Sequence, residues 1–178
     1  MIMRQRSSGG PVACSARQMA GNYPGAARDL EEALDISRDI GSRRGQADAL
    51  KVLGRIRRLT GDYPAAAQAL EQALGIFRNI GDRGGEAETL NESGTLSMVH
   101  GDLRQAGSCH QQALNLARQI GSARYEARAL AGLGRCALAA DRTAEAEDGL
   151  RQALEIFQRI GAAEAADVSA ELGPLSVR

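Results

Sequence analysis

The sequence predicts an all-α fold in which antiparallel helical hairpins stack in series. Glycine recurs at an interval of forty residues, at Gly21, Gly61 and Gly101, and one alanine of each period recurs at the same interval. These alanines are Ala33, Ala73, Ala113 and Ala153. Apolar residues around them are spaced by three and four, as in an amphipathic helix with one buried face. A fixed period of this size indicates a repeat array whose units pack only on their neighbours.

The composition restricts the partners that such an array could have. The 178 residues include 22 basic and 22 acidic side chains, a balance that favours neither nucleic acid nor membrane. No segment approaches the roughly 20 apolar residues of a membrane span, and Met1 to Gly10 lacks the apolar run of a signal peptide. We therefore expect a cytoplasmic protein.

The second helix of each predicted hairpin ends at a repeated Ile-Gly pair. The glycines of these pairs are Gly41, Gly81, Gly121 and Gly161. Glycine readily adopts the left-handed conformation that closes a helix C-terminus, so we expect each helix to stop there.

The first helix of each hairpin is predicted to begin after Ser42, Asp82 or Ser122, whose side chains can cap a helix N-terminus. Each of these helices has an interior glycine, and the three are Gly54, Gly94 and Gly134. A glycine costs roughly 1 kcal/mol relative to alanine inside a helix, so its recurrence predicts a close helix crossing at that point.

The period divides the chain into units. We expect an irregular or disordered N-terminus at 1–12 and one array over 13–173, followed by a tail at 174–178. The array comprises a partial unit (13–40), full units (43–80, 83–120 and 123–160) and a terminal helix (163–173). Glu164, Asp167 and Glu171 are expected to give this helix a polar outer face. The front end lacks an equally clear cap, so a homodimer through the terminal helices and membership of a longer array both stay open.

One unit has the residue spacing of a known repeat family. The matching residues are Leu50, Leu53, Gly54, Gly61, Asp62, Tyr63, Ala66, Leu70, Ala73 and Leu74. Ala87–Ile120 and Ala127–Ile160 match through two more units. These stretches resemble the tetratricopeptide repeat (TPR) family over nearly the whole chain. The resemblance implies a TPR solenoid, in which hairpins form a right-handed superhelix.

The period is longer than the 34 residues usual in that family. In this respect the chain is similar to the 40-residue repeats of actinobacterial regulators of the AfsR and antibiotic-regulatory-protein type. Leu59–Ala67 and the pair Asn91-Glu92 before Gly94 carry this likeness. It implies a binding or regulatory module that is not an enzyme and uses no cofactor.

Two departures from the period are informative. His110 stands where the other units have leucine, and Asp141 replaces the glycine of the turn. Relatives that clamp a peptide backbone carry Asn before the Leu-Gly pair, whereas this chain has Val52, Glu92 and Gly132 there.

The resemblance places a concave binding surface on the first helix of each hairpin. The residues that correspond by position are Asp48, Lys51, Arg55, Arg58, Glu88, Asn91, Glu92, Thr95, Met98, Arg128, Ala131, Arg135 and Leu138. This lining would be basic, then acidic and polar, then basic with an apolar floor. Because arginine suits paired contacts with carboxylates, the lining predicts a protein or peptide segment that carries acidic groups. The alternative is that these charges are simply solvated.

Reactive residues give little support to catalysis. Cys14, Cys109 and Cys136 lack metal-ligand spacing and are expected to be buried free thiols. His110 is expected in the core and His100 at a solvent-facing helix end, and neither has a matching nucleophile or metal-ligand set.

The sequence leaves two further functions open. One is a sensor whose groove takes a small peptide or metabolite. The other is nucleic-acid binding through the basic cluster around Arg43 and Arg58, against which zero net charge and the lack of stacking aromatics argue.

Overall fold

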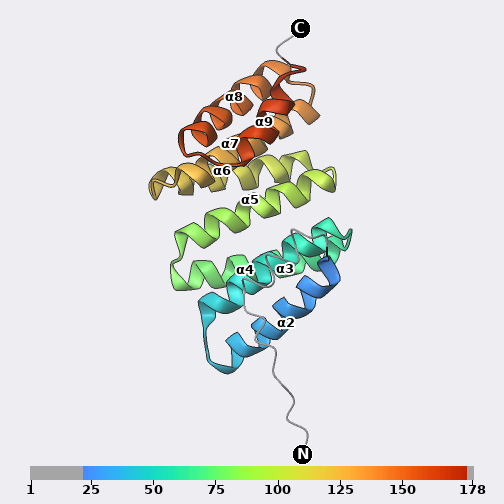
Figure 1. The fold of residues 1–178 in the computed structure, drawn as a ribbon, viewed down its shortest axis with the longest axis vertical. Coiled ribbons are helices and arrows are strands. Elements are labelled where there is room, and N and C mark those ends of the chain that lie inside the picture. The colour runs from blue at the N-terminus through green and yellow to red at the C-terminus, as the bar shows by residue number, and fades with distance from the viewer. Residues whose placement is uncertain (1–21, 176–178) are drawn as a thin grey trace, which may run out of the picture. The chain divides into compact units, whose positions relative to one another are not determined.

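The computed structural model describes residues 22–175, and the regular structure in this range is entirely helical (Figure 1). The helices are α2 (Tyr23–Asp39), α3 (Arg43–Leu59), α4 (Tyr63–Ile80), α5 (Arg83–Val99), α6 (Leu103–Gln119), α7 (Ala123–Ala139), α8 (Thr143–Arg159) and α9 (Glu164–Leu172). The predicted all-α hairpin fold is therefore confirmed. Cys14 and the predicted segment 1–12 lie outside the described residues.

The chain divides into two compact units, residues 1–76 and 77–178. In the first, α2 packs on α3, and α3 packs on the part of α4 that precedes Phe77. In the second, α5, α6, α7 and α8 each pack on the helix that follows, and α5 also contacts α7. None of the described helices has the length and apolar character needed to cross a membrane.

The turns follow the predicted glycine pattern. Gly41, Gly81, Gly121 and Gly161 have φ values of 68°, 71°, 66° and 64°, in the left-handed region. Asp141 has φ 58° and is the one non-glycine residue with positive φ in the range 22–175. An aspartate tolerates this conformation better than most residues, which explains why it can replace the glycine of this turn.

The predicted caps are confirmed at two of three helices. Ser42 Oγ accepts a hydrogen bond from Gly45 N at 3.2 Å, and Asp82 Oδ1 accepts one from Gly85 N at 2.9 Å. Ser122 occupies the N-cap position of α7 but its side chain makes no capping hydrogen bond, so the expectation for this residue is wrong. Nothing in the contacts of Ser122 explains the difference.

The interior glycines do mark close helix crossings. A Cβ atom on Gly54 would lie 2.6 Å from Leu70 Cγ and 3.3 Å from the carbonyl oxygen of Ala66. A Cβ atom on Gly134 would lie 3.1 Å from both Ala146 O and Leu150 N. At Gly54 and Gly134 the first helix of the hairpin thus approaches the backbone of the second, as the recurrence of glycine predicted, whereas Gly94 faces the side chain of His110.

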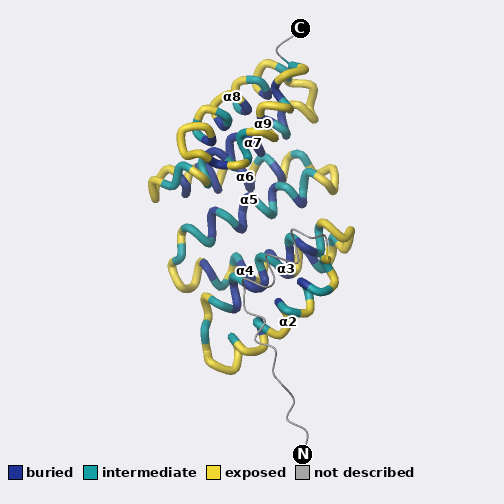
Figure 2. Tube along the Cα trace, in the orientation of Figure 1, coloured by how far each residue is buried: buried dark blue, intermediate teal, exposed yellow. Residues whose placement is uncertain are grey.

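The buried residues of both units, dark blue in Figure 2, include many small side chains. The repeated alanines at 66, 73, 106, 113, 146 and 153 are fully buried. Larger side chains enter where the facing residue is small. A Cβ atom on Gly85 would lie 2.3 Å from the ring of Phe77, which is itself fully buried. The core is therefore tightly packed without tryptophan.

Close packing predicts that a long charged side chain cannot enter these positions. We expect Ala113→Arg to destabilise the second unit by more than about 3 kcal/mol, because a buried guanidinium would have neither space nor a counter-ion. Gln112→Arg, at the adjacent exposed position of α6, is the control and should change stability by less than about 0.5 kcal/mol. Denaturant unfolding followed by circular dichroism measures both. Equal stability of the two variants would contradict this packing.

Two glycines should respond to alanine with opposite signs. Gly121 has φ 66°, so Gly121→Ala should cost about 1 kcal/mol through strain in the left-handed region. Gly107 lies inside α6 and a Cβ atom there meets nothing within 4 Å, so Gly107→Ala should stabilise by about 0.5–1 kcal/mol. Thermal unfolding measures the stability of both variants. A loss of stability in Gly107→Ala as well as in Gly121→Ala would contradict the open space beside Gly107.

Candidate partner-binding groove

The first helix of the first full unit, α3, presents a basic face. Lys51 Nζ lies 3.2 Å from Asp48 Oδ1, and Arg44 Nε lies 3.9 Å from Asp48 Oδ2. Arg55 and Arg58 are half-buried on the same helix. Four cationic side chains, those of Arg44, Lys51, Arg55 and Arg58, therefore lie on the face of α3 that also carries Asp48.

In the second unit, α5 and α7 are joined by charge pairs between predicted groove residues. Arg128 Nη1 lies 3.6 Å from Glu88 Oε1. The hydroxyl of Tyr125, also on α7, donates to Glu88 Oε2 at 3.5 Å. Acidic and basic groove residues that were expected to face a partner thus contact each other.

The same face of α7 binds carboxylates of the terminal helix α9. Arg128 Nη2 donates to Glu164 Oε1 at 2.9 Å. Arg135 makes a bidentate contact with Glu171, through Nε at 2.9 Å and Nη2 at 2.7 Å. Glu164 and Glu171 lie seven residues apart and so project from one side of α9.

This arrangement corrects the expected role of the α9 carboxylates. Glu164 and Glu171 do not form an outer face toward solvent, because they are held by arginines of α7. Partial burial raises the pKa of Glu164, but hydrogen bonds and the Arg128 guanidinium outweigh it, so this pKa lies below its ordinary value. Asp167 is exposed, as expected for all three.

A cavity of ≈180 Å³ lies between α5, α7 and α9. We refer to it as the α5–α7–α9 cavity. It brings together the predicted groove residues Asn91, Glu92, Thr95, Arg128, Ala131 and Arg135. Met98 and Leu138 are not part of its lining, and Leu138 is 39% exposed. His110, Phe157, Glu164, Asp167 and Val168 also line it, although they were not predicted as groove residues.

His110 reaches this cavity from α6, behind the two groove helices. Its ring fills space that is open because two neighbours are glycine: a Cβ atom on Gly94 would lie 2.7 Å from Nε2, and one on Gly132 would lie 2.4 Å from Cε1. His110 is only 2% exposed, which confirms the predicted core histidine. His100 is exposed at the C-cap of α5, as predicted.

A short hydrogen-bond chain fixes the tautomer of His110. Asn91 Nδ2 donates to the carbonyl oxygen of Tyr125 at 3.3 Å, which leaves Asn91 Oδ1 as an acceptor. His110 Nδ1 lies 3.0 Å from this oxygen and must therefore carry the proton. Nε2 is then a lone-pair acceptor, and it is buried without a hydrogen-bond partner among the described residues.

The environment keeps His110 neutral. Burial, and secondarily the charge of Arg135, lower its pKa from 6.5 to about 4. At neutral pH the ring therefore carries no charge, and Nε2 has a lone pair that can accept a hydrogen bond.

The sequence contains a signal for this site in three departures from the forty-residue period. His110 replaces a leucine, Gly132 stands where other units have Val52 and Glu92, and Asn91 stands where they have Lys51 and Ala131. The three departures meet in space around one imidazole ring. Glycine at 132 makes room for the imidazole and asparagine at 91 hydrogen-bonds it, so these substitutions compensate for the replacement of leucine by His110.

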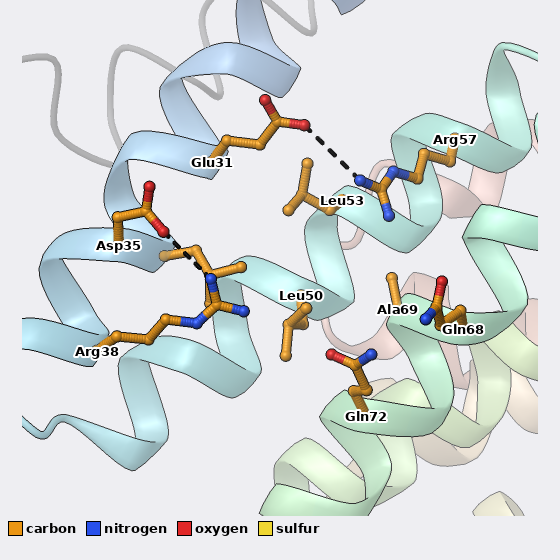
Figure 3. Close-up of a pocket in the computed structure, with 10 residues that line it drawn as sticks. Glu31, Asp35, Arg38, Leu50, Leu53, Arg57, Gln68, Ala69 and Gln72 are labelled. Atoms are coloured by element: carbon orange, nitrogen blue, oxygen red, sulfur yellow. Dashed lines mark hydrogen bonds and ion pairs between the residues drawn. The ribbon is translucent and has the colours of Figure 1, made fainter.

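The first unit has a larger cavity, of ≈370 Å³, between α2, α3 and α4 (Figure 3). Its floor includes Leu50 and Leu53, which are almost fully buried. Charged groups of its rim are paired with each other: Arg57 Nη2 lies 3.7 Å from Glu31, and Arg38 Nη1 lies 3.1 Å from Asp35. The rim therefore offers mainly amide groups, from Gln68 and Gln72, to a ligand.

The described cysteines are free and buried. Burial raises the pKa of both Cys109 and Cys136, which keeps them protonated at neutral pH. Within residues 22–175, no group of three or more His, Cys, Asp or Glu side chains is placed to hold a metal ion.

Comparison with known proteins identifies the family. The family model described as tetratricopeptide repeat matches residues 14–79 and 85–159. The chain belongs to the TPR family. The TPR fold generally mediates protein–protein interactions, and TPR proteins are generally non-catalytic scaffolds. No curated protein matches this sequence significantly.

Several solved TPR-like structures share the fold. BtubC (BKLC) from P. vanneervenii is 22% identical with a TM-score of 0.72, and the match covers 84% of this chain and 62% of that one. A Rap protein complexed with Competence and Sporulation Factor is 17% identical with a TM-score of 0.84 (92% and 46% covered). The nearly identical TPR-like repeats from P. anserina are 17% identical with a TM-score of 0.69 (92% and 82% covered). The chain thus spans less than two thirds of the length of BtubC and about half that of the Rap protein.

The depressed pKa of His110 predicts a pH-dependent stability. Between about pH 6.5 and pH 4 the unfolded chain binds a proton that the folded chain excludes, so stability should fall as the pH falls through this window. From about pH 7.5 to about pH 5 the His110 contribution should drop by about 2 kcal/mol. Urea unfolding of the native chain and of His110→Leu at both pH values measures this difference.

His100→Gln is the matched control, because this histidine is exposed. It should keep the pH dependence of the native chain, whereas His110→Leu should lose it. An identical pH dependence in native chain and His110→Leu would contradict the assigned environment.

Proposed function

We propose that this chain is a non-catalytic TPR scaffold that binds a segment of a partner protein through the groove faces of α3, α5 and α7. The observation that carries the proposal is the basic face of α3, where Lys51, Arg55 and Arg58 lie on one side of the helix that corresponds to the concave surface in the family. Acidic groups of a partner fit this face, because guanidinium groups bind carboxylates in pairs.

The arginines of α7 take a different part in this proposal. Arg128 and Arg135 were expected to contact an acidic partner, but both are engaged with carboxylates of their own chain. An acidic segment would compete at these arginines with Glu164 and Glu171 of α9.

We further infer a regulatory setting in the cytoplasm, of the kind found in AfsR-type regulators. The 40-residue period and the likeness of Leu59–Ala67 to those arrays support it. The fold match to a Rap protein complexed with Competence and Sporulation Factor is consistent with such a role.

The α5–α7–α9 cavity and the α2–α3–α4 cavity favour a second candidate, a sensor of a small peptide or metabolite. Binding of such a ligand would stabilise the folded chain, which a thermal-shift assay with candidate ligands would detect.

The test of the scaffold proposal is crosslinked affinity capture from a lysate of the source organism. We expect the native chain to capture a protein that the Arg55→Glu, Arg58→Glu variant captures at least about tenfold less well, because both changes reverse charge on the α3 face. Arg135 is left unchanged, because its substitution would release Glu171 and disturb α9.

The control variant carries Arg104→Glu and Arg159→Glu, which make the same change of charge at exposed positions of α6 and α8. It should capture the partner as the native chain does. Equal capture by both variants, or capture of copies of this chain alone, would show that the array acts through its convex face or its ends.

A further inference from the structure

Helix α2 leaves two isoleucines largely uncovered. Ile40 is 72% exposed and Ile36 is 53% exposed, the highest values for large apolar side chains within residues 22–175. At the position of Ile40 in the forty-residue period, the later units have Ile80, Ile120 and Ile160, which are 39%, 40% and 37% exposed. The two isoleucines of α2 lie about one helical turn apart. They therefore form an apolar patch that is more exposed than its counterparts in the other units.

These isoleucines belong to one ridge of α2. Arg28, Glu32, Ile36 and Ile40 are spaced by four residues, so their side chains follow one another along one side of the helix. Asp39 follows Ile36 by three residues and borders the same ridge. All five residues are exposed. We refer to them as the outer face of α2.

The charged groups of the outer face of α2 are not engaged inside the protein. The side chains of Arg28, Glu32 and Asp39 form no ion pair or hydrogen bond with the described residues, whereas the neighbouring Arg38 pairs with Asp35 at 3.1 Å. Arg28 and Asp39 are eleven residues apart, about three turns of helix, and therefore lie on the same flank of the ridge. The face thus has a cation toward its N-terminal end and a carboxylate toward its C-terminal end.

This pattern is complementary to itself when two copies of the helix lie antiparallel. The same flanks of the two helices then meet, and the N-terminal part of one helix lies beside the C-terminal part of the other. Arg28 of each copy meets Asp39 of the other, which gives two ion pairs related by a two-fold axis. The same register places Ile40 beside the methylene groups of Arg28 of the second copy, and Ile36 beside those of Glu32. A parallel pair would instead place like charges side by side, which is unfavourable.

We propose that the outer face of α2 binds the same face of a second copy of this chain, in an antiparallel pair with two-fold symmetry. Burial of Ile36 and Ile40 drives the association, because these are the most exposed large apolar side chains among the described residues. The Arg28–Asp39 pairs select the antiparallel orientation and contribute less to the affinity. The pairing concerns assembly of the scaffold and uses none of the groove residues of α3, α5 and α7, so it goes beyond the proposed function.

The test exchanges charges between copies. Arg28→Glu and Asp39→Arg should each weaken self-association of the full chain at least about tenfold, because each homodimer then has two like-charge contacts. An equimolar mixture of the two variants should form a heterodimer, in which both contacts again join opposite charges. Sedimentation velocity measures the monomer–dimer equilibrium, and native mass spectrometry identifies the heterodimer by its mass. A mixture that forms no heterodimer, or a native chain that stays monomeric at every concentration, would overturn the proposal.

Apolar variants locate the contact. Ile36→Ser combined with Ile40→Ser should leave the chain monomeric with an unchanged circular dichroism spectrum, because both residues are exposed. Ile120→Ser combined with Ile160→Ser is the control at exposed positions that end α6 and α8, and it should dimerise as the native chain does. Equal dimerisation of the two double variants would refute the interface. No groove residue is changed, so self-association and partner capture can succeed or fail separately.

Discussion

Close approach of helix backbones is the constraint on which the rest of this structure depends. The first helix of a hairpin meets the second at a glycine, as Gly54 meets Ala66 and Gly134 meets Ala146, and the repeated alanines are fully buried between helices. Small side chains have few rotatable bonds, so a core built from them cannot rearrange to accommodate a larger residue. A larger residue can enter only where a neighbour becomes smaller, as Phe77 does beside Gly85.

His110 is the clearest result of that constraint. An imidazole in place of leucine needs room, which Gly94 and Gly132 provide, and it needs a polar partner, which Asn91 provides through Oδ1. Only one of its two nitrogens is satisfied. The lining of the α5–α7–α9 cavity therefore includes a neutral imidazole at the position where the other units have leucine.

The sequence was sufficient for the fold because the fold is repeated. Every turn glycine and interior glycine is seen several times, so the helix bounds and the close crossings could be predicted from the period alone. The site was predicted less well, because contacts between units are not repeated. The approach of Glu164 and Glu171 to Arg128 and Arg135 depends on how α9, a shorter helix outside the forty-residue register, lies on its neighbours. Repetition can also mislead. Ser122 occupies the repeated capping position, but its side chain does not form the capping hydrogen bond that Ser42 and Asp82 form.

Apolar burial and ion pairs contribute unequally to the packing of α9 on its neighbours. Burial of Val168 and Leu172 stabilises the helix by about 1.5–3 kcal/mol for each side chain. Its ion pairs are about one-third exposed and contribute at most about 1 kcal/mol each. Apolar contacts therefore hold α9 in place, and the ion pairs mainly determine its register and orientation. The pairing of charges on this face is then a consequence of hydrophobic packing, because the buried Val168 and Leu172 bring Glu164 and Glu171 to the arginines of α7.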